Sequence, residues 1–148
     1  MIELVFVIVV IGILSAIALP RFAATRTDAV IAKGRSQIAS IRSGISMQKS
    51  RNMLQGERQT NSYYPDNLDN AAYNTDGENL FYFNDGNESN ILEYPIVSLQ
   101  DRDGHWVKTA ANEYAFFITT DRNVTFDYNS TTGRFACSDS ADCRALTQ

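Results

Sequence analysis

Apolar residues fill the start of the chain almost without interruption. From Leu4 to Leu19 the only breaks are Gly12 and Ser15, and Met1 and Ile2 extend the run on the other side of Glu3. This run is close to the ~17–25 apolar residues that a membrane-spanning helix needs. No basic residue precedes it and no small-residue cleavage site closes it, unlike a secretory signal. The pattern predicts a retained apolar helix over residues 1–20.

A second helical pattern continues beyond Pro20, over residues 21–55. Isoleucines recur at steps of seven, three and four residues, at Ile31, Ile38, Ile41 and Ile45, which is one narrow apolar stripe on a helix. Pro20 lacks a backbone donor, so we expect a kink there. Together the two segments predict a helix of about fifty residues, ~75 Å long, which no domain of this size covers completely. We expect the basic side chains to face away from the stripe: Arg26, Lys33, Arg35, Arg42 and Lys49.

Residues 56–148 change to the pattern of a small β-rich head. Asp-Gly pairs supply turns at 76–77, 85–86 and 103–104, and a polar stretch from Leu54 to Asn79 predicts a surface loop. Short runs of β-branched and aromatic residues predict strands at Leu80–Phe83, Ile91–Val97, Tyr114–Thr119, Asn123–Tyr128 and Arg134–Cys137. The predicted fold class is therefore α+β, with one long N-terminal helix packed on a small antiparallel sheet.

Charge divides the chain into a basic stem and an acidic head. Residues 21–58 hold eight basic and two acidic residues, whereas residues 59–148 hold five basic and fourteen acidic ones. A basic stripe is compatible with nucleic-acid binding, but here it must also meet membrane headgroups and the acidic heads of neighbouring copies. The asymmetry favours contacts between copies over DNA binding.

The two cysteines, Cys137 and Cys143, enclose five residues. Two thiols alone make a weak metal site, and the spacing is not that of a C-x-x-C redox pair. An apolar anchor and a paired cysteine count are typical of an exported, oxidising setting. We expect a disulfide that stabilises the head by ~2–3 kcal/mol at most, because its loop is short.

The sequence offers little to catalysis or to a cofactor. His105 is the single histidine, beside Trp106 in a turn, and we interpret it as a surface or packing residue. Asp101 and Asp103 resemble the start of a calcium loop, but Asn112 stands where such a loop needs its glutamate. We therefore predict a non-enzymatic protein without a cofactor, and calcium binding is the weaker alternative.

Three N-x-[ST] motifs lie in the head, at Asn87, Asn123 and Asn129. Each has an aspartate two residues earlier, which matches the extended acceptor of bacterial oligosaccharyltransferases. Asp and Asn also cluster in turns for structural reasons. Glycosylation of at least one of the three sites is a hypothesis that the pattern supports.

Glu3 is the unusual feature of the apolar run. A carboxylate within a bilayer costs roughly 2.5–3.5 kcal/mol on insertion scales. Glu3 therefore either lies at the headgroup boundary or neutralises a positive charge, such as the α-amino group of a neighbouring copy.

The segment MIELVFVIVVIGILSAIALPRF resembles the N-terminus of the type IV pilins and the type II secretion pseudopilins. In that family a prepilin peptidase removes a short basic leader, and the new N-terminal residue is methylated. The resemblance covers residues 1 to about 26 and gives Glu3, Gly12 and Pro20 assembly roles. It also implies that a leader and the first two mature residues are missing ahead of Met1. It implies a helix packed on a small sheet, and a C-terminal disulfide-bounded loop that is often longer than this one.

The resulting expectation is a structural subunit of a type IV pilus-like filament that polymerises through its N-terminal helix. Its partners would be copies of itself, the inner membrane before assembly, the prepilin peptidase and the pilus or secretion assembly machinery. It would be stored in a bacterial inner membrane and then assembled outside it. A pseudopilin of a type II secretion system is the alternative within the family, and a monomeric membrane-anchored binding or sensor domain is the alternative from another class.

Overall fold

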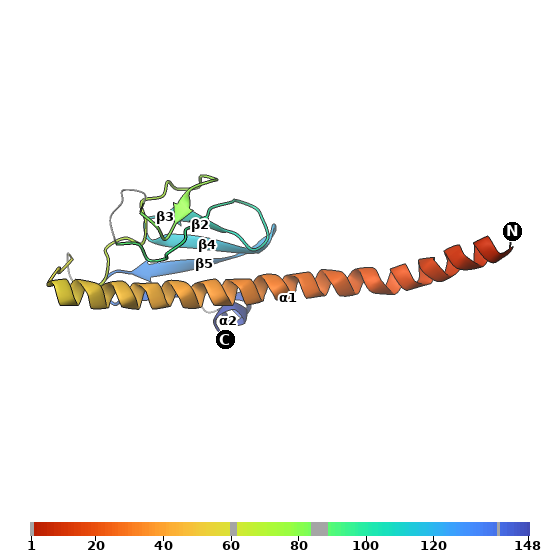
Figure 1. Cartoon of the computed structure of the whole chain (residues 1–148), viewed down its shortest axis with the longest axis horizontal. Coiled ribbons are helices and arrows are strands. Elements are labelled where there is room, and N and C mark those ends of the chain that lie inside the picture. The colour runs from red at the N-terminus through yellow and green to blue at the C-terminus, as the bar shows by residue number, and fades with distance from the viewer. Residues whose placement is uncertain (1, 60–61, 84–88, 139) are drawn as a thin grey trace.

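One helix, α1 (Ile2–Gln55), forms the axis of the molecule. The computed structural model describes residues 2–59, 62–83, 89–138 and 140–148, and for residues 18–24 it describes the backbone alone. Figure 1 shows α1 running past the head, so that its N-terminal half projects far beyond it. The helix ends as the sequence predicts. Gly56 has φ +71°, and the next backbone N–H, of Glu57, donates to the Asn52 carbonyl at 2.9 Å, which closes the last turn.

The head contains a four-stranded antiparallel sheet with the order β3-β4-β5-β6. Neighbouring strands follow one another in the chain, so short turns can join them. A separate two-stranded sheet pairs β1 (Asn79–Leu80) with β2 (Ile96–Val97). The strands of the larger sheet are β3 (Trp106–Ala110), β4 (Glu113–Thr119), β5 (Arg122–Asn129) and β6 (Arg134–Cys137).

Aromatic side chains of the sheet form the core against the second half of α1. Strand β5 shows the cause, because exposed and buried residues alternate along it and bury Val124, Phe126 and Tyr128. From α1, the stripe Ile38, Ile41 and Ile45 is buried in the same cluster. The other rings of this cluster are Phe81, Trp106, Tyr114, Phe116 and Phe135. The structure thus confirms the α+β class and the burial of three of the four stripe isoleucines, while Ile31 is partly buried against the same core.

Three local predictions are wrong. Strand β3 was predicted as part of a turn, but the turn ends at Gly104 (φ +75°) and Trp106 already pairs with Phe116. Of the strands predicted over residues 80–83 and 91–97, only Leu80 and Ile96–Val97 lie in strands, in β1 and β2 respectively.

The third error is α2 (Ala141–Thr147), which the sequence did not predict at all. Ser140 caps it, because the Ser140 hydroxyl oxygen accepts from the Cys143 backbone N–H at 3.0 Å. Seven residues are too few for a clear helical period. This helix exists because its buried face, Cys143 and Leu146, packs on the rest of the head.

Candidate assembly site

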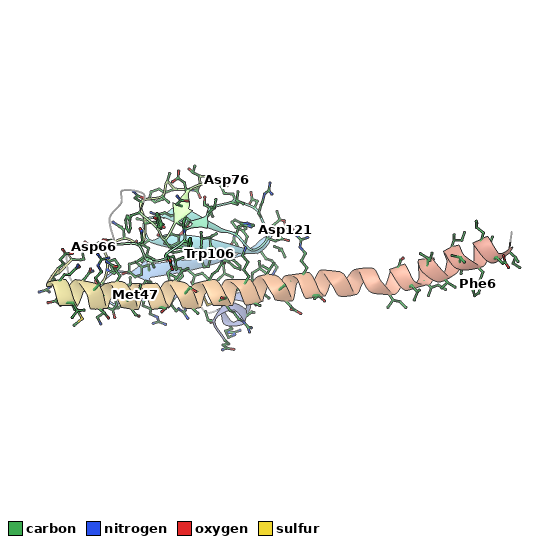
Figure 2. All side chains as sticks on the ribbon, in the orientation of Figure 1. Phe6, Met47, Asp66, Asp76, Trp106 and Asp121 are labelled. Atoms are coloured by element: carbon green, nitrogen blue, oxygen red, sulfur yellow. A yellow bond between two sulfur atoms is a disulfide. The ribbon has the colours of Figure 1, made fainter. Side chains whose placement is uncertain are left out.

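The apolar half of α1 has no cover from its own head. Every residue from Ile2 to Ile17 is exposed, and large side chains such as Phe6 and Leu14 expose 69% and 62% of their surface. Figure 2 shows Phe6 near the far end of the helix, remote from the head. A contiguous apolar surface beyond a few hundred Å² marks a surface that binds another protein or a membrane.

Glu3 lies in the first turn of α1 and is exposed. Its neighbours Ile2 and Leu4 are also exposed. A carboxylate is favourable at this end of a helix, since the N-terminus carries a partial positive charge. Met1 lies outside the described residues. The partner that the sequence analysis expects for Glu3 belongs to another copy, so the pairing stays a prediction.

Gly12 and Pro20 lie inside a continuous helix. A Cβ added at Gly12 would meet no atom within 4 Å among the described residues. The backbone of α1 is helical through Pro20, whereas the Pro20 side chain lies outside the described part. Their role in assembly stays a prediction. Among the residues that the structure describes, no helix is both long enough and apolar enough to cross a bilayer.

The basic side chains of α1 do not face away from the head, which corrects the expectation from sequence. They lie beside the apolar stripe rather than opposite to it, and their long side chains reach the head on either side. Three of them donate to backbone carbonyls: Lys33 Nζ to Gly104 at 2.8 Å, Arg35 Nε to Ala145 at 2.6 Å, and Arg42 Nε to Phe135 at 3.1 Å.

Two further basic residues of α1 also contact the head. Arg26 forms a salt bridge with Asp103 at 3.2 Å. Lys49 Nζ donates to the Tyr64 hydroxyl at 3.1 Å and lies 4.4 Å from the centre of that ring. These basic groups attach the stem to its own head. Within the described part of the chain, only Arg26 among these five residues pairs with an acidic residue of the head, so the expected contacts between copies stay a prediction.

A buried ion pair holds the long loop onto the sheet. The Asp69 carboxylate accepts from Lys108 Nζ at 2.8 Å, from the Tyr114 hydroxyl at 3.0 Å and from the Phe81 N–H at 2.8 Å. Burial, together with the Asp69 charge, raises the pKa of Tyr114 far above its ordinary value. Sequence reasoning missed this pair, because a lysine and an aspartate far apart in the chain are normally solvent-exposed. Its donors occupy both carboxylate oxygens, so we assign it a structural role.

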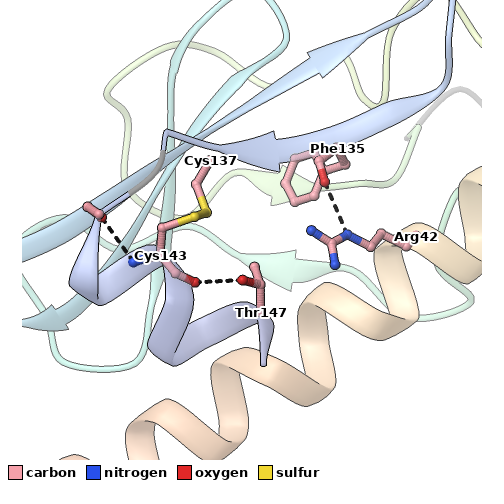
Figure 3. Close-up of a disulfide and its surroundings, with 6 residues drawn as sticks. Arg42, Phe135, Cys137, Cys143 and Thr147 are labelled. Atoms are coloured by element: carbon pink, nitrogen blue, oxygen red, sulfur yellow. Dashed lines mark hydrogen bonds between the residues drawn. A yellow bond between two sulfur atoms is a disulfide. The ribbon is translucent and has the colours of Figure 1, made fainter.

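The predicted disulfide is present between Cys137 and Cys143, whose Cα atoms are 5.9 Å apart. It joins the end of β6 to α2, as Figure 3 shows. The Thr147 hydroxyl donates to the Cys143 carbonyl at 2.8 Å within the same short helix. The residues from Arg144 to Thr147 are thus helical, and Leu146 among them is packed on the head.

Two of the three glycosylation motifs can be located. Asn123 and Asn129 are both exposed on β5. The Asn129 side-chain oxygen accepts from the N–H groups of Thr131 and Thr132, each at 3.0 Å, so it already shapes a turn. Asn87 lies outside the described residues. Glycosylation stays a prediction.

The described residues near Asp101 and Asp103 do not form the ligand arrangement of a calcium site. Asp103 is paired with Arg26, and strand β3 separates Asp101 from Asn112, which lies in the turn before β4. Among the described residues, no group of three or more His, Cys, Asp or Glu side chains could hold a metal ion. His105 is half-buried, and its Nδ1 lies 3.0 Å from the Asp103 carbonyl oxygen.

No protein-family model, curated protein or solved structure matches the chain.

Proposed function

We propose that this chain is a structural, non-enzymatic subunit of a type IV pilus-like filament, assembled through the N-terminal half of α1. The observation that carries the proposal is the exposed segment Ile2–Ile17, which is apolar on all sides except at Glu3 and Ser15. A helix that is hydrophobic all round is stable only when other elements bury it. In this chain the head covers only the second half of the helix.

The resemblance of the first 26 or so residues to the type IV pilins and pseudopilins supports a specific charge balance within that buried contact. A bundle of such helices would be dry, and an unpaired Glu3 inside it would cost several kcal/mol. The α-amino group of a neighbouring copy supplies the opposite charge. Pairing of the two groups would then set the register of each added subunit.

Before assembly, we propose, the same helix keeps the subunit in the bacterial inner membrane. The support is the apolar run Leu4–Leu19 of the sequence, of which Ala18 and Leu19 lie outside the residues whose side chains the structure describes. A prepilin peptidase and a pilus or secretion assembly machinery would act on this form. The final location distinguishes two forms of the proposal, since a pilus is extracellular and a secretion pseudopilus is periplasmic.

The test replaces Glu3 by Gln in the native host and counts filaments in sheared and periplasmic fractions by electron microscopy with an antibody against the head. Filament yield should fall at least tenfold at normal subunit levels, because the amine of the neighbour then has no counter-charge. The matched control is Glu57→Gln, at an exposed acid just beyond the end of α1, which should leave the yield unchanged.

Two results would count against the proposal. Normal filament yield from Glu3→Gln would make Glu3 a headgroup-facing acid without an assembly role. A wild-type chain that forms no filament in either fraction would favour a monomeric anchored binding or sensor domain.

A further inference from the structure

Strand β5 carries two of the three glycosylation motifs, one at each end. Asn123 belongs to the motif of residues 121–125, and Asn129 belongs to the motif of residues 127–131. Both asparagines are exposed, and so are the aspartates before them, Asp121 and Asp127, because the alternating residues of β5 face the core. Exposure therefore does not distinguish the two motifs, but their backbone surroundings do.

The motif of Asn123 lies inside a paired strand. Asn123 and Thr125 both pair with residues of β4, and Val124 between them is only 5% exposed. A glycan transferase must enclose the residues on both sides of the asparagine in its own active site. At Asn123 this requires that β5 leave β4 and expose Val124. Strand pairing and burial therefore oppose transfer to Asn123 in the folded head.

Asn129 is the last residue of β5, and a turn begins there. The Gly133 backbone N–H donates to the Asn129 carbonyl at 2.7 Å, and Gly133 has φ +70°, a conformation that favours glycine. The serine and threonine that follow Asn129 in its motif thus lie outside the paired strands. A transferase can reach Asn129 from the side of this turn without separating β5 from β4.

The three groups that define this motif are available for recognition. The Asn129 side-chain oxygen accepts from the Thr131 and Thr132 N–H groups, which orients the amide group. Within the part of the chain that the structure describes, nothing bonds to the Asn129 Nδ2 nitrogen, the Asp127 carboxylate or the Thr131 hydroxyl. The nitrogen that would receive the sugar is therefore held in a fixed direction with both of its hydrogens free.

The surface of the sheet is hollowed next to Asn129. An open space of about 540 Å³ lies over β5 and β6, and its polar lining includes Asp127, Thr132, Arg134 and Ser138. Arg134 lies opposite Asn129 in the strand register. Sugar hydroxyl groups both donate and accept hydrogen bonds, so a carboxylate, two hydroxyls and a guanidinium are suitable partners. The hollow thus offers room and hydrogen-bond partners to the first sugar residues of a glycan.

We propose that Asn129 is a glycosylation site of the folded head and that Asn123 is not. The donor is an oligosaccharide linked to a lipid diphosphate. The bond from C1 of its first sugar to the phosphate oxygen breaks, and a bond from C1 to Asn129 Nδ2 forms. The lipid diphosphate leaves with the bonding electron pair, and the Nδ2 proton passes to a base of the transferase.

The position of the site is compatible with the proposed filament but does not depend on it. The buried residues of β5, Phe126 and Tyr128 among them, share a cluster with the isoleucines of α1. Asn129 follows Tyr128 and is exposed, so its side chain lies on the face of the sheet that points away from α1. A bulky, hydrophilic glycan on that face leaves the apolar half of α1 accessible to neighbouring copies.

Mass spectrometry of the intact full chain from its native host tests the site. Asn129→Gln should remove the mass of one oligosaccharide relative to the wild type, because the glutamine is not an acceptor. The matched substitution Asn123→Gln, on the same strand and equally exposed, should remove none. The comparison between variants is independent of any other modification of the chain.

Peptide fragmentation then locates the glycan directly. One tryptic peptide covers residues 123–134 and contains both asparagines, so the fragmentation method must leave the glycan attached to its residue. We expect the glycan on Asn129 in at least nine-tenths of the modified peptide.

A pair of aspartate substitutions tests recognition of the motif without changing either asparagine. Asp127→Asn should lower the occupancy of Asn129 at least tenfold, because it removes the negative charge that the extended acceptor motif requires. The matched substitution Asp121→Asn should change this occupancy less than twofold. Fluorescence of Trp106 in both purified variants should match the wild type, which excludes misfolding as the cause.

Three results would overturn the inference. An unmodified wild type, or a glycan on Asn123 in place of Asn129, would show that the site is wrong. Equal occupancy of both asparagines would show that transfer precedes folding, so that the fold selects neither. Normal occupancy in Asp127→Asn would show that a transferase of this class does not read the motif. The filament function is tested separately by Glu3→Gln and stands or falls without these results.

Discussion

The two halves of α1 contain the same kind of residue in opposite surroundings. Ile38, Ile41 and Ile45 expose 1%, 0% and 1% of their surface, whereas Ile8, Ile11 and Ile13 expose 57%, 56% and 59%. Both sets belong to one continuous helix. The difference lies in what covers them, since only the second half meets the aromatic core of the head.

The width of the apolar surface explains this division. In the second half, the buried isoleucines form a narrow stripe, which a single sheet can cover. In the first half, apolar side chains point in all directions around the helix, so one sheet could cover only part of them. A single sheet can bury a narrow apolar stripe, whereas an apolar surface around the whole helix needs several neighbouring elements to bury it. We therefore expect the second half to respond to changes in the head and the first half to respond to changes in assembly.

The largest effect on stability should come from truncating the buried stripe. Ile41→Ala should lower the free energy of unfolding of the head by about 2–5 kcal/mol, because it leaves a cavity in a packed core. The matched substitution Ile11→Ala, at an exposed isoleucine of the first half, should change it by less than about 0.5 kcal/mol. Urea denaturation of the full chain in mild detergent, followed by fluorescence of Trp106, measures both. Equal losses in the two variants would contradict the division of the helix.

Substitution of one glycine in each half of α1 should show the same difference between the halves, with a smaller change in stability. Gly44→Ala should destabilise the head by about 1–3 kcal/mol, because the added methyl group overlaps the Ile91 carbonyl and forces the backbone to shift. Gly12→Ala meets no neighbouring atom among the described residues, and it should favour the helix by up to about 1 kcal/mol.

Thermal unfolding measures the first variant of this pair, and helix content by circular dichroism measures the second. If Gly12 must extend during assembly, Gly12→Ala should also lower filament yield while the head stays as stable as the wild type. A Gly44→Ala head of wild-type stability would show that segment 91–93 can move away from α1 at little cost.

The smallest effect should come from the ion pair near the boundary of the two halves. Arg26 is 75% exposed in its salt bridge with Asp103, and exposed pairs contribute about 0–1 kcal/mol. Arg26→Gln should therefore reduce the free energy of unfolding by less than about 1 kcal/mol, and 0.5 M salt should remove most of the difference. A larger loss that persists in salt would mean that Arg26 supports the head through packing.

Sequence reasoning was reliable where a pattern is local. The length of α1, its end near Gly56, the buried isoleucine stripe and the strands β4 to β6 follow from periodicity, propensity and turn chemistry within a few residues. Of the candidate assembly residues, Glu3 was found because one acid in an apolar run is visible without any structure. The exposed apolar half of α1 is visible for the same reason.

It was unreliable where long-range contacts decide. Helix α2 is too short to show a period, and it depends on the disulfide and on the stem beneath it. The pair of Asp69 and Lys108 joins residues 39 positions apart, which no local pattern reveals. The basic residues of α1 were expected to face away from the stripe, but the sequence does not show which groups of the head lie beside it, and the long basic side chains reach these groups.

The sequence by itself determined that this protein has a long helix with two kinds of surface and a compact α+β head, because apolar period and turn residues act over a few positions. The tertiary structure alone decided which distant groups pair, such as Asp69 with Lys108, and which face of α1 the head leaves exposed. The physical reason is that burial and pairing depend on which distant segments share a space. Gly44 is an example. A side chain is excluded there by the carbonyl oxygen of Ile91, a residue 47 positions away in the chain.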